Sequence, residues 1–69
     1  MTIKKLENKI AKILGVFSGQ TVEENGCLVS RTNCNTLLED GQLRKLLKLG
    51  NVEMKRSGDG IRILITVLI

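Results

Sequence analysis

The strongest constraint on the fold is the apolar segment formed by residues 61–69. Successive side chains of an extended strand point to opposite faces. One face of this segment would carry only branched aliphatic side chains: Ile61, Ile63, Ile65, Val67 and Ile69. The other face would be half apolar, with Arg62, Leu64, Thr66 and Leu68. Such a strand needs cover on both sides. We therefore expect it to be central in a sheet between two layers, or to meet another molecule on one face.

The length of the chain limits how much of that cover it can supply itself. Its 69 residues make a single domain, 1–69. A domain of this size buries only about 60% of the surface of its unfolded chain, so its own core is barely sufficient. An exposed apolar strand would also promote aggregation. We therefore expect a homo-oligomer whose interface includes Ile61, Ile63, Leu64, Ile65, Val67 and Leu68.

The first half of the chain predicts a helix followed by a hairpin. Apolar residues recur at helical spacing over residues 2–16, with Thr2 as the N-terminal cap and Gly15 at the exit. Asn25-Gly26 separates two short runs with strand character within residues 20–31. This dipeptide is typical of a two-residue hairpin turn. The following residues, 32–35, have turn-like composition.

The second half repeats this order. Residues 36–49 have helical character, but Asp40-Gly41 interrupts the apolar pattern and allows two short helices in place of one. Residues 51–69 predict a second hairpin that turns at residues 57–60. Glycine at the helix exit and in the turn recurs at an offset of about 35 residues, which fits either duplication or chance reuse. We expect a small α+β domain of order αββαββ, with two helices packed on an antiparallel sheet.

An alternative fold follows from residues 43–56. This segment resembles the junction between the recognition helix and the wing of winged helix-turn-helix proteins. The resemblance implies that the second helix enters the major groove and that the hairpin touches the nucleic-acid backbone. Two features depart from that pattern. Gln42 stands where an apolar residue is usual, and the last strand is longer and more apolar than a wing requires.

The charge of the chain favours an anionic partner. Eleven Lys and Arg against seven Asp and Glu give a formal net charge of +4. Phosphate contacts are expected from the basic residues of both helices and of the second hairpin, namely Lys5, Lys9, Lys12, Arg44, Lys45, Lys48, Lys55 and Arg56. Ordinary solvated helix surfaces are the alternative explanation. Phe17 is the one aromatic residue, so recognition of single strands by base stacking is disfavoured and a duplex is favoured.

Residue types for catalysis or metal binding are scarce. The chain has no histidine, and Cys27 and Cys34 are its two cysteines. We therefore expect no catalytic residues, no metal site and no cofactor. No apolar run reaches the roughly 20 residues that span a bilayer, so no membrane partner is expected. The first residues begin an amphipathic pattern and not an apolar signal core, which favours a reducing cytoplasm. A Cys27–Cys34 disulfide is the alternative to two reduced thiols.

Two functional hypotheses of different classes follow. In the first, the protein is a small basic nucleic-acid-binding accessory or regulatory protein that contacts duplex backbones. In the second, it is a protein–protein interaction module, such as a small inhibitor or adaptor of the kind that phages and mobile elements encode. Its partner would then be an acidic protein surface. Positive charge suits both hypotheses, so the charge alone does not decide between them.

Overall fold

The computed structural model describes residues 1–34, 38–58 and 60–68. The elements along the chain are α1 (Ile3–Leu14), β1 (Gly19–Glu24), β2 (Cys27–Cys34), α2 (Asp40–Leu49), β3 (Asn51–Ser57) and β4 (Gly60–Leu68). The predicted order αββαββ is therefore confirmed, and the molecule is an α+β domain. Asn35, Asp59 and Ile69, which the sequence assigned to a turn-like segment, a turn and a strand, lie outside the described residues.

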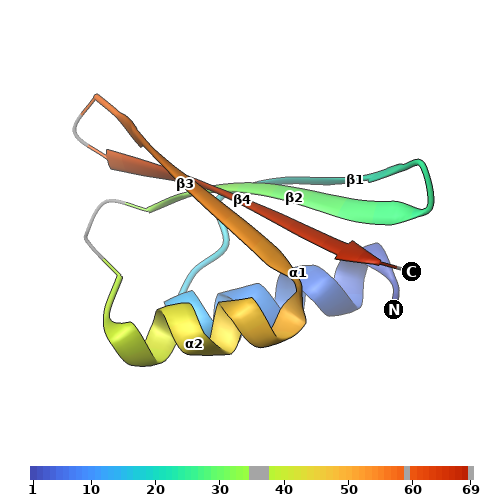
Figure 1. Ribbon diagram of the computed structural model, residues 1–69, viewed down its shortest axis with the longest axis horizontal. Coiled ribbons are helices and arrows are strands. Elements are labelled where there is room, and N and C mark those ends of the chain that lie inside the picture. Colours follow the sequence, from blue (N-terminus) through green and yellow to red (C-terminus); the bar gives the residue numbers. More distant parts are fainter. Residues whose placement is uncertain (35–37, 59, 69) are drawn as a thin grey trace.

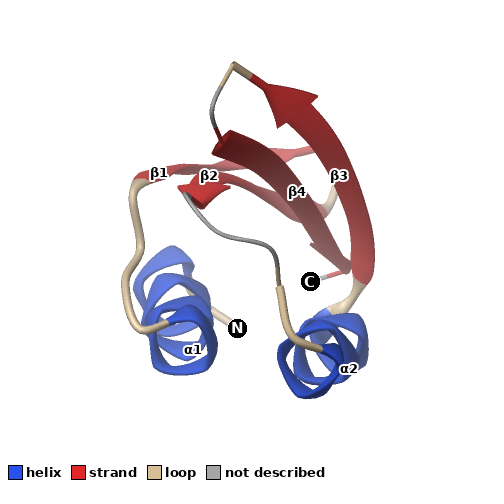
Figure 2. Ribbon diagram, turned by 90° about the vertical axis from the view of Figure 1, so that its left-hand side faces the viewer, coloured by secondary structure: helices blue, strands red, loops and turns tan. Residues whose placement is uncertain are grey.

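The four strands form one antiparallel sheet in the order β1-β2-β4-β3. The central pair, β2 and β4, runs in register from Cys27 opposite Leu68 to Cys34 opposite Ile61. Both helices cover the same face of this sheet, with α1 on the β1–β2 side and α2 on the β3–β4 side (Figures 1 and 2). The whole β1–β2 hairpin separates the two helices in the chain. The structure is consequently not the winged helix-turn-helix that residues 43–56 resembled.

Local signals determine where α1 and the first hairpin begin and end. The Thr2 hydroxyl accepts a hydrogen bond from the backbone N–H of Lys5 at 3.2 Å, which caps the helix. Gly15 has φ = 86°, and its N–H donates to the carbonyl of Ala11, so the helix ends in a left-handed glycine. The hairpin turns at Asn25-Gly26, where both residues have positive φ, as a type I′ turn requires.

Two predictions of local structure need correction. Helix α2 begins at Asp40, where the sequence allowed a second short helix to start, and residues 38 and 39 before it are not helical, so the helix expected over residues 36–49 is confirmed only from residue 40 onward. Its N-cap is Glu39, whose N–H donates to the side-chain oxygen of Gln42 at 3.0 Å. The turn-like segment after the first hairpin is strand as far as Cys34, because residues 32–34 pair with residues 61–63 of β4.

The core lies between the helices and the covered face of the sheet. Its buried residues are Leu6 and Ile10 of α1, Leu28 of β2, Leu46 of α2, and Ile63, Ile65 and Val67 of β4. The branched aliphatic face of the last strand is thus sheltered by helices of the same chain. Its other face receives no such cover from the described residues, and Leu68 is 83% exposed. We expected cover on both faces of the last strand. The chain itself covers only the face with the isoleucines.

Buried hydroxyl groups complete the covered face near α1. Thr21, Ser30 and Thr32 are all less than 10% exposed. The hydroxyls of Thr21 and Ser30 form a 2.7 Å hydrogen bond across β1 and β2. Thr32 Oγ1 donates to the carbonyl of Ser18 and accepts from the Ser18 N–H. Each buried hydroxyl therefore has a partner, which removes most of the penalty for burying it.

Candidate functional site

The face of the sheet that the helices leave open is the candidate site. Its members alternate with the buried residues along each strand and are matched across the sheet by the strand register. They come from all four strands: Gln20, Val22 and Glu24 of β1; Cys27, Val29, Arg31 and Asn33 of β2; Asn51, Glu53, Lys55 and Ser57 of β3; Arg62, Leu64, Thr66 and Leu68 of β4. We call this surface the open face.

One end of the open face is hollowed and cationic. The hollow has a volume of about 600 Å³ and is lined by Arg31, Glu53, Met54, Lys55, Arg62 and Leu64. We call Arg31, Lys55 and Arg62 the cationic cluster. It lies toward the turn between β3 and β4, and all three of its side chains are exposed. Glu53 is the one carboxylate among the lining residues.

The strand register explains why these cations are close together. Arg31 of β2 is directly opposite Leu64 of β4, and Leu64 is directly opposite Glu53 of β3. Arg62 is likewise opposite Lys55. Side chains in directly opposite positions have Cβ atoms about 4.5–5.5 Å apart, and like charges there destabilise a sheet. An anion bound between Arg62 and Lys55 would relieve this repulsion.

The other end of the open face is mostly apolar, although the exposed Glu24 lies there opposite Cys27. Val22 is opposite Val29, and Cys27 is opposite Leu68. Val29 is only 8% exposed, whereas Leu68 is 83% exposed. We call these four residues the apolar end. The open face is therefore polarised along its strands, with cations near one hairpin turn and aliphatic side chains near the other.

The accessible surface of the molecule agrees with an uncovered face. It amounts to 4956 Å² for a chain of 7.6 kDa. A compact monomer of that mass is expected to expose about 4,300 Å². The excess is the expected consequence of a two-layer structure whose sheet is covered on one side (Figure 2).

The structure distributes the predicted phosphate-binding residues over different surfaces. Lys55 belongs to the cationic cluster, whereas Arg56 alternates to the other side of β3 and is exposed there. The remaining six are exposed residues of the helix layer, on the opposite side of the molecule: Lys5, Lys9 and Lys12 of α1, and Arg44, Lys45 and Lys48 of α2.

Sequence reasoning did not select Arg31 or Arg62 as binding residues. Strand alternation already placed Arg62 on the face opposite the isoleucines. The sequence did not place Arg31 on the same face as Arg62, because the pairing of β2 with β4 is not encoded in either strand alone.

The residues of the predicted oligomer interface lie on both faces of the sheet. Ile63, Ile65 and Val67 are buried in the chain's own core, and Ile61 packs against that core. Leu64 and Leu68 lie on the open face. A partner that meets the last strand from outside would therefore contact these two leucines and not the buried isoleucines.

The two cysteines lie at opposite ends of β2 and on opposite faces of the sheet. Seven residue steps along the strand separate their Cα atoms by about 23 Å, far beyond the span of a disulfide. They do not bridge to each other. Over residues 1–34, 38–58 and 60–68, no group of three or more His, Cys, Asp or Glu residues is placed to hold a metal ion. No helix in the described part of the chain is both long and apolar enough to cross a bilayer.

Comparisons with protein-family models, with curated proteins and with solved structures found no match to this chain.

Proposed function

We propose that the protein binds duplex nucleic acid through the cationic cluster of its open face. The observation that carries this proposal is the hollow in which Arg31, Lys55 and Arg62 converge from three adjacent strands. Three exposed cations with one carboxylate among them form a local excess of positive charge. Phosphates are the natural ligands of such a group, because arginine presents donors that match phosphate oxygens.

The composition of the open face supports a duplex and not a single strand. Proteins that bind single strands stack the bases on aromatic side chains, and the open face carries none among its described residues. Phe17 packs against the core instead. A strand surface with arginine, asparagine and glutamine side chains is suited to a groove and its flanking phosphates. The contacts are therefore expected to be groove and backbone contacts.

Charge disfavours one way of seating a second copy of the chain on this face. Stacking two open faces with the same hairpin turns at the same end would bring two cationic clusters toward each other. Like charges brought together in an interface cost several kcal/mol, unless Glu53 of each copy neutralised the cluster of the other. An anionic polymer meets the same surface without that penalty.

The test is the salt dependence of binding, measured by fluorescence anisotropy with a labelled DNA duplex. We compare the wild type with the triple variant Arg31→Gln/Lys55→Gln/Arg62→Gln. Each lost phosphate contact lowers the slope of log K against log salt by about 0.9, so the triple variant should lose about 2.7 from the magnitude of that slope. All three side chains are exposed, so circular dichroism should show an unchanged fold.

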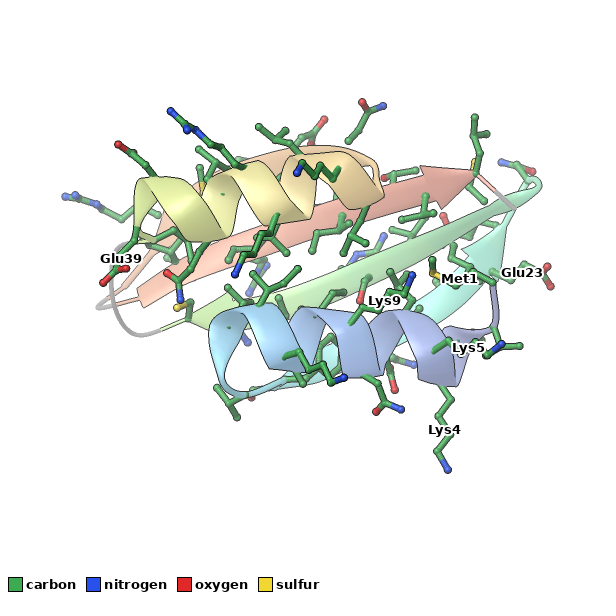
Figure 3. All side chains as sticks on the ribbon, turned by 90° about the horizontal axis from the view of Figure 1, so that it is seen from below. Met1, Lys4, Lys5, Lys9, Glu23 and Glu39 are labelled. Carbon is green, nitrogen blue, oxygen red and sulfur yellow. The ribbon has the colours of Figure 1, made fainter. Side chains whose placement is uncertain are left out.

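A matched control separates a local contact from an effect of net charge. Arg62→Gln and Lys4→Gln each remove one positive charge. Lys4 projects from α1 away from the body of the protein (Figure 3). Only Arg62→Gln should change the slope. Equal effects of the two substitutions, or no binding by the wild type at micromolar protein in low salt, would refute the proposal.

The apolar end of the open face favours one alternative function, a protein–protein interaction module. Leu68 is 83% exposed at one end of a face whose other end is cationic. A protein segment with acidic and apolar residues would complement both ends. Purification with one stoichiometric protein partner, which Leu68→Glu abolishes, together with no affinity for duplex, would establish this function in place of the first.

A further inference from the structure

Five exposed lysines lie on the outer surface of the helix layer, on the side of the molecule opposite the open face. The helices run antiparallel on the same face of the sheet (Figure 1). At 3.6 residues per turn, Lys5, Lys9 and Lys12 fall within about 60° on one flank of α1. Lys45 and Lys48 fall within about 60° on one flank of α2. We call these five residues the lysine strip.

Packing of the helices places both flanks on the outer surface of the helix layer, with Lys9 and Lys45 nearest the seam between the two helices. The buried residues Leu6, Ile10 and Leu46 face the sheet, which sets the rotation of each helix. Figure 3 shows Lys9 on the side of α1 that faces α2. On α2, Gln42 lies on the flank toward α1, because its side-chain amide donates to the carbonyl of Ile13 at 3.3 Å.

The lysine strip carries unbalanced charge. The acidic residues of the helices lie elsewhere: Glu7 on the far flank of α1, and Glu39 and Asp40 at the beginning of α2. All five lysines are exposed, and none is held in an ion pair with a described residue. From Lys5 to Lys12 the strip extends about 10 Å along α1. A row of like charges at this spacing binds a polyanion in preference to a single small anion.

We infer that the lysine strip is a second surface for duplex nucleic acid, so that one protein molecule bridges two duplexes. This inference depends on the proposed function of the open face. The two surfaces lie on opposite layers of a molecule with principal extents of 31 × 23 × 17 Å. One duplex cannot wrap both, because bending DNA so sharply costs far more than these contacts return. A second duplex is therefore the occupant of the strip.

The experiment is a capture assay with two DNA duplexes. One duplex is immobilised, the other is labelled, and the full chain is added at low salt. The strip variant Lys5→Gln/Lys9→Gln/Lys12→Gln is compared with the cluster variant Arg31→Gln/Lys55→Gln/Arg62→Gln. Each removes three positive charges from exposed positions. The wild type should capture the labelled duplex, and both variants should lose capture. The strip variant should still bind a single duplex by anisotropy, through its intact cationic cluster.

The outcomes are distinguishable. Capture by the strip variant at the wild-type level would overturn the inference. If the wild type binds one duplex but captures no second, the bridging inference fails and the proposed function stands. If the wild type binds no duplex, both fail. Binding to phosphatidylserine vesicles that the strip variant loses, without duplex capture, would assign the strip to an anionic lipid surface and overturn the inference.

Discussion

Replacing Ile65 by alanine tests the central packing of the molecule. Ile65 is 0% exposed in the middle of β4, where it packs with the residues of both helices that face the sheet. Truncation of a buried isoleucine to alanine destabilises proteins by roughly 2–5 kcal/mol. A chain of this length has a total free energy of unfolding of roughly 3–10 kcal/mol. Ile65→Ala should therefore lose much of the stability of the protein.

A milder substitution keeps the effect measurable if the alanine variant is mostly unfolded. Ile65→Val removes one methylene and should cost about 0.5–1.5 kcal/mol. For a domain of this size, that corresponds to a fall in Tm of roughly 2–12 °C. Leu68→Ala is the matched control, since it shortens a side chain of the same strand on the open face. Leu68 is mostly in solvent, so its truncation should change the free energy of unfolding by less than about 0.5 kcal/mol.

Urea denaturation followed by far-ultraviolet circular dichroism measures all three variants. The midpoint should fall in the order Leu68→Ala, Ile65→Val, Ile65→Ala, with similar m values for the variants that remain folded. If Ile65→Ala unfolds at the wild-type midpoint, the covered face of β4 is not the core. If Leu68→Ala is as destabilising as Ile65→Ala, the side chain of Leu68 is buried in solution, and the open face is not exposed.

Three further predictions use the same unfolding measurement. Gly50→Ala should destabilise the protein by about 1–3 kcal/mol, because the added methyl group would overlap the carbonyl oxygen of Thr66. Gly41→Ala should raise stability by about 0.5–1 kcal/mol, because it lies in α2 with open space around it. Thr21→Val leaves the buried Ser30 hydroxyl without its partner and should cost about 1–3 kcal/mol. Adding Ser30→Ala should recover part of that loss, and a purely additive double-mutant cycle would contradict the hydrogen bond.

Features encoded by neighbouring residues were predictable from the sequence. Helix α1 has its cap, apolar stripe and terminal glycine within a few residues of one another, so Thr2 and Gly15 were identified correctly. The turn at Asn25-Gly26 and the order αββαββ follow from equally local signals. Each depends on backbone preferences and periodicity, which act within one element.

Features that depend on distant residues were decided by the tertiary structure. Residues 32–34 look like a turn, yet they are strand because β4 pairs with them. Thr21 and Ser30 are polar, yet their mutual hydrogen bond allows their burial on the covered face. For the candidate site, the sequence indicated Lys55 but not Arg31 or Arg62, which join it through strand pairing.

The last strand and the two helices show both kinds of feature, those encoded locally and those set by the tertiary structure. The sequence by itself determined that β4 has one purely aliphatic face and that each helix has a row of cations. Only the folded chain decided which face the helices cover, and which cations meet. Arg31 and Arg62 join Lys55 through the register of three strands, and Lys9 comes to lie on the side of α1 that faces α2 through antiparallel helix packing. The physical reason is that strand pairing and helix docking are set by packing between segments far apart in the chain, whose free energy no local window of sequence contains.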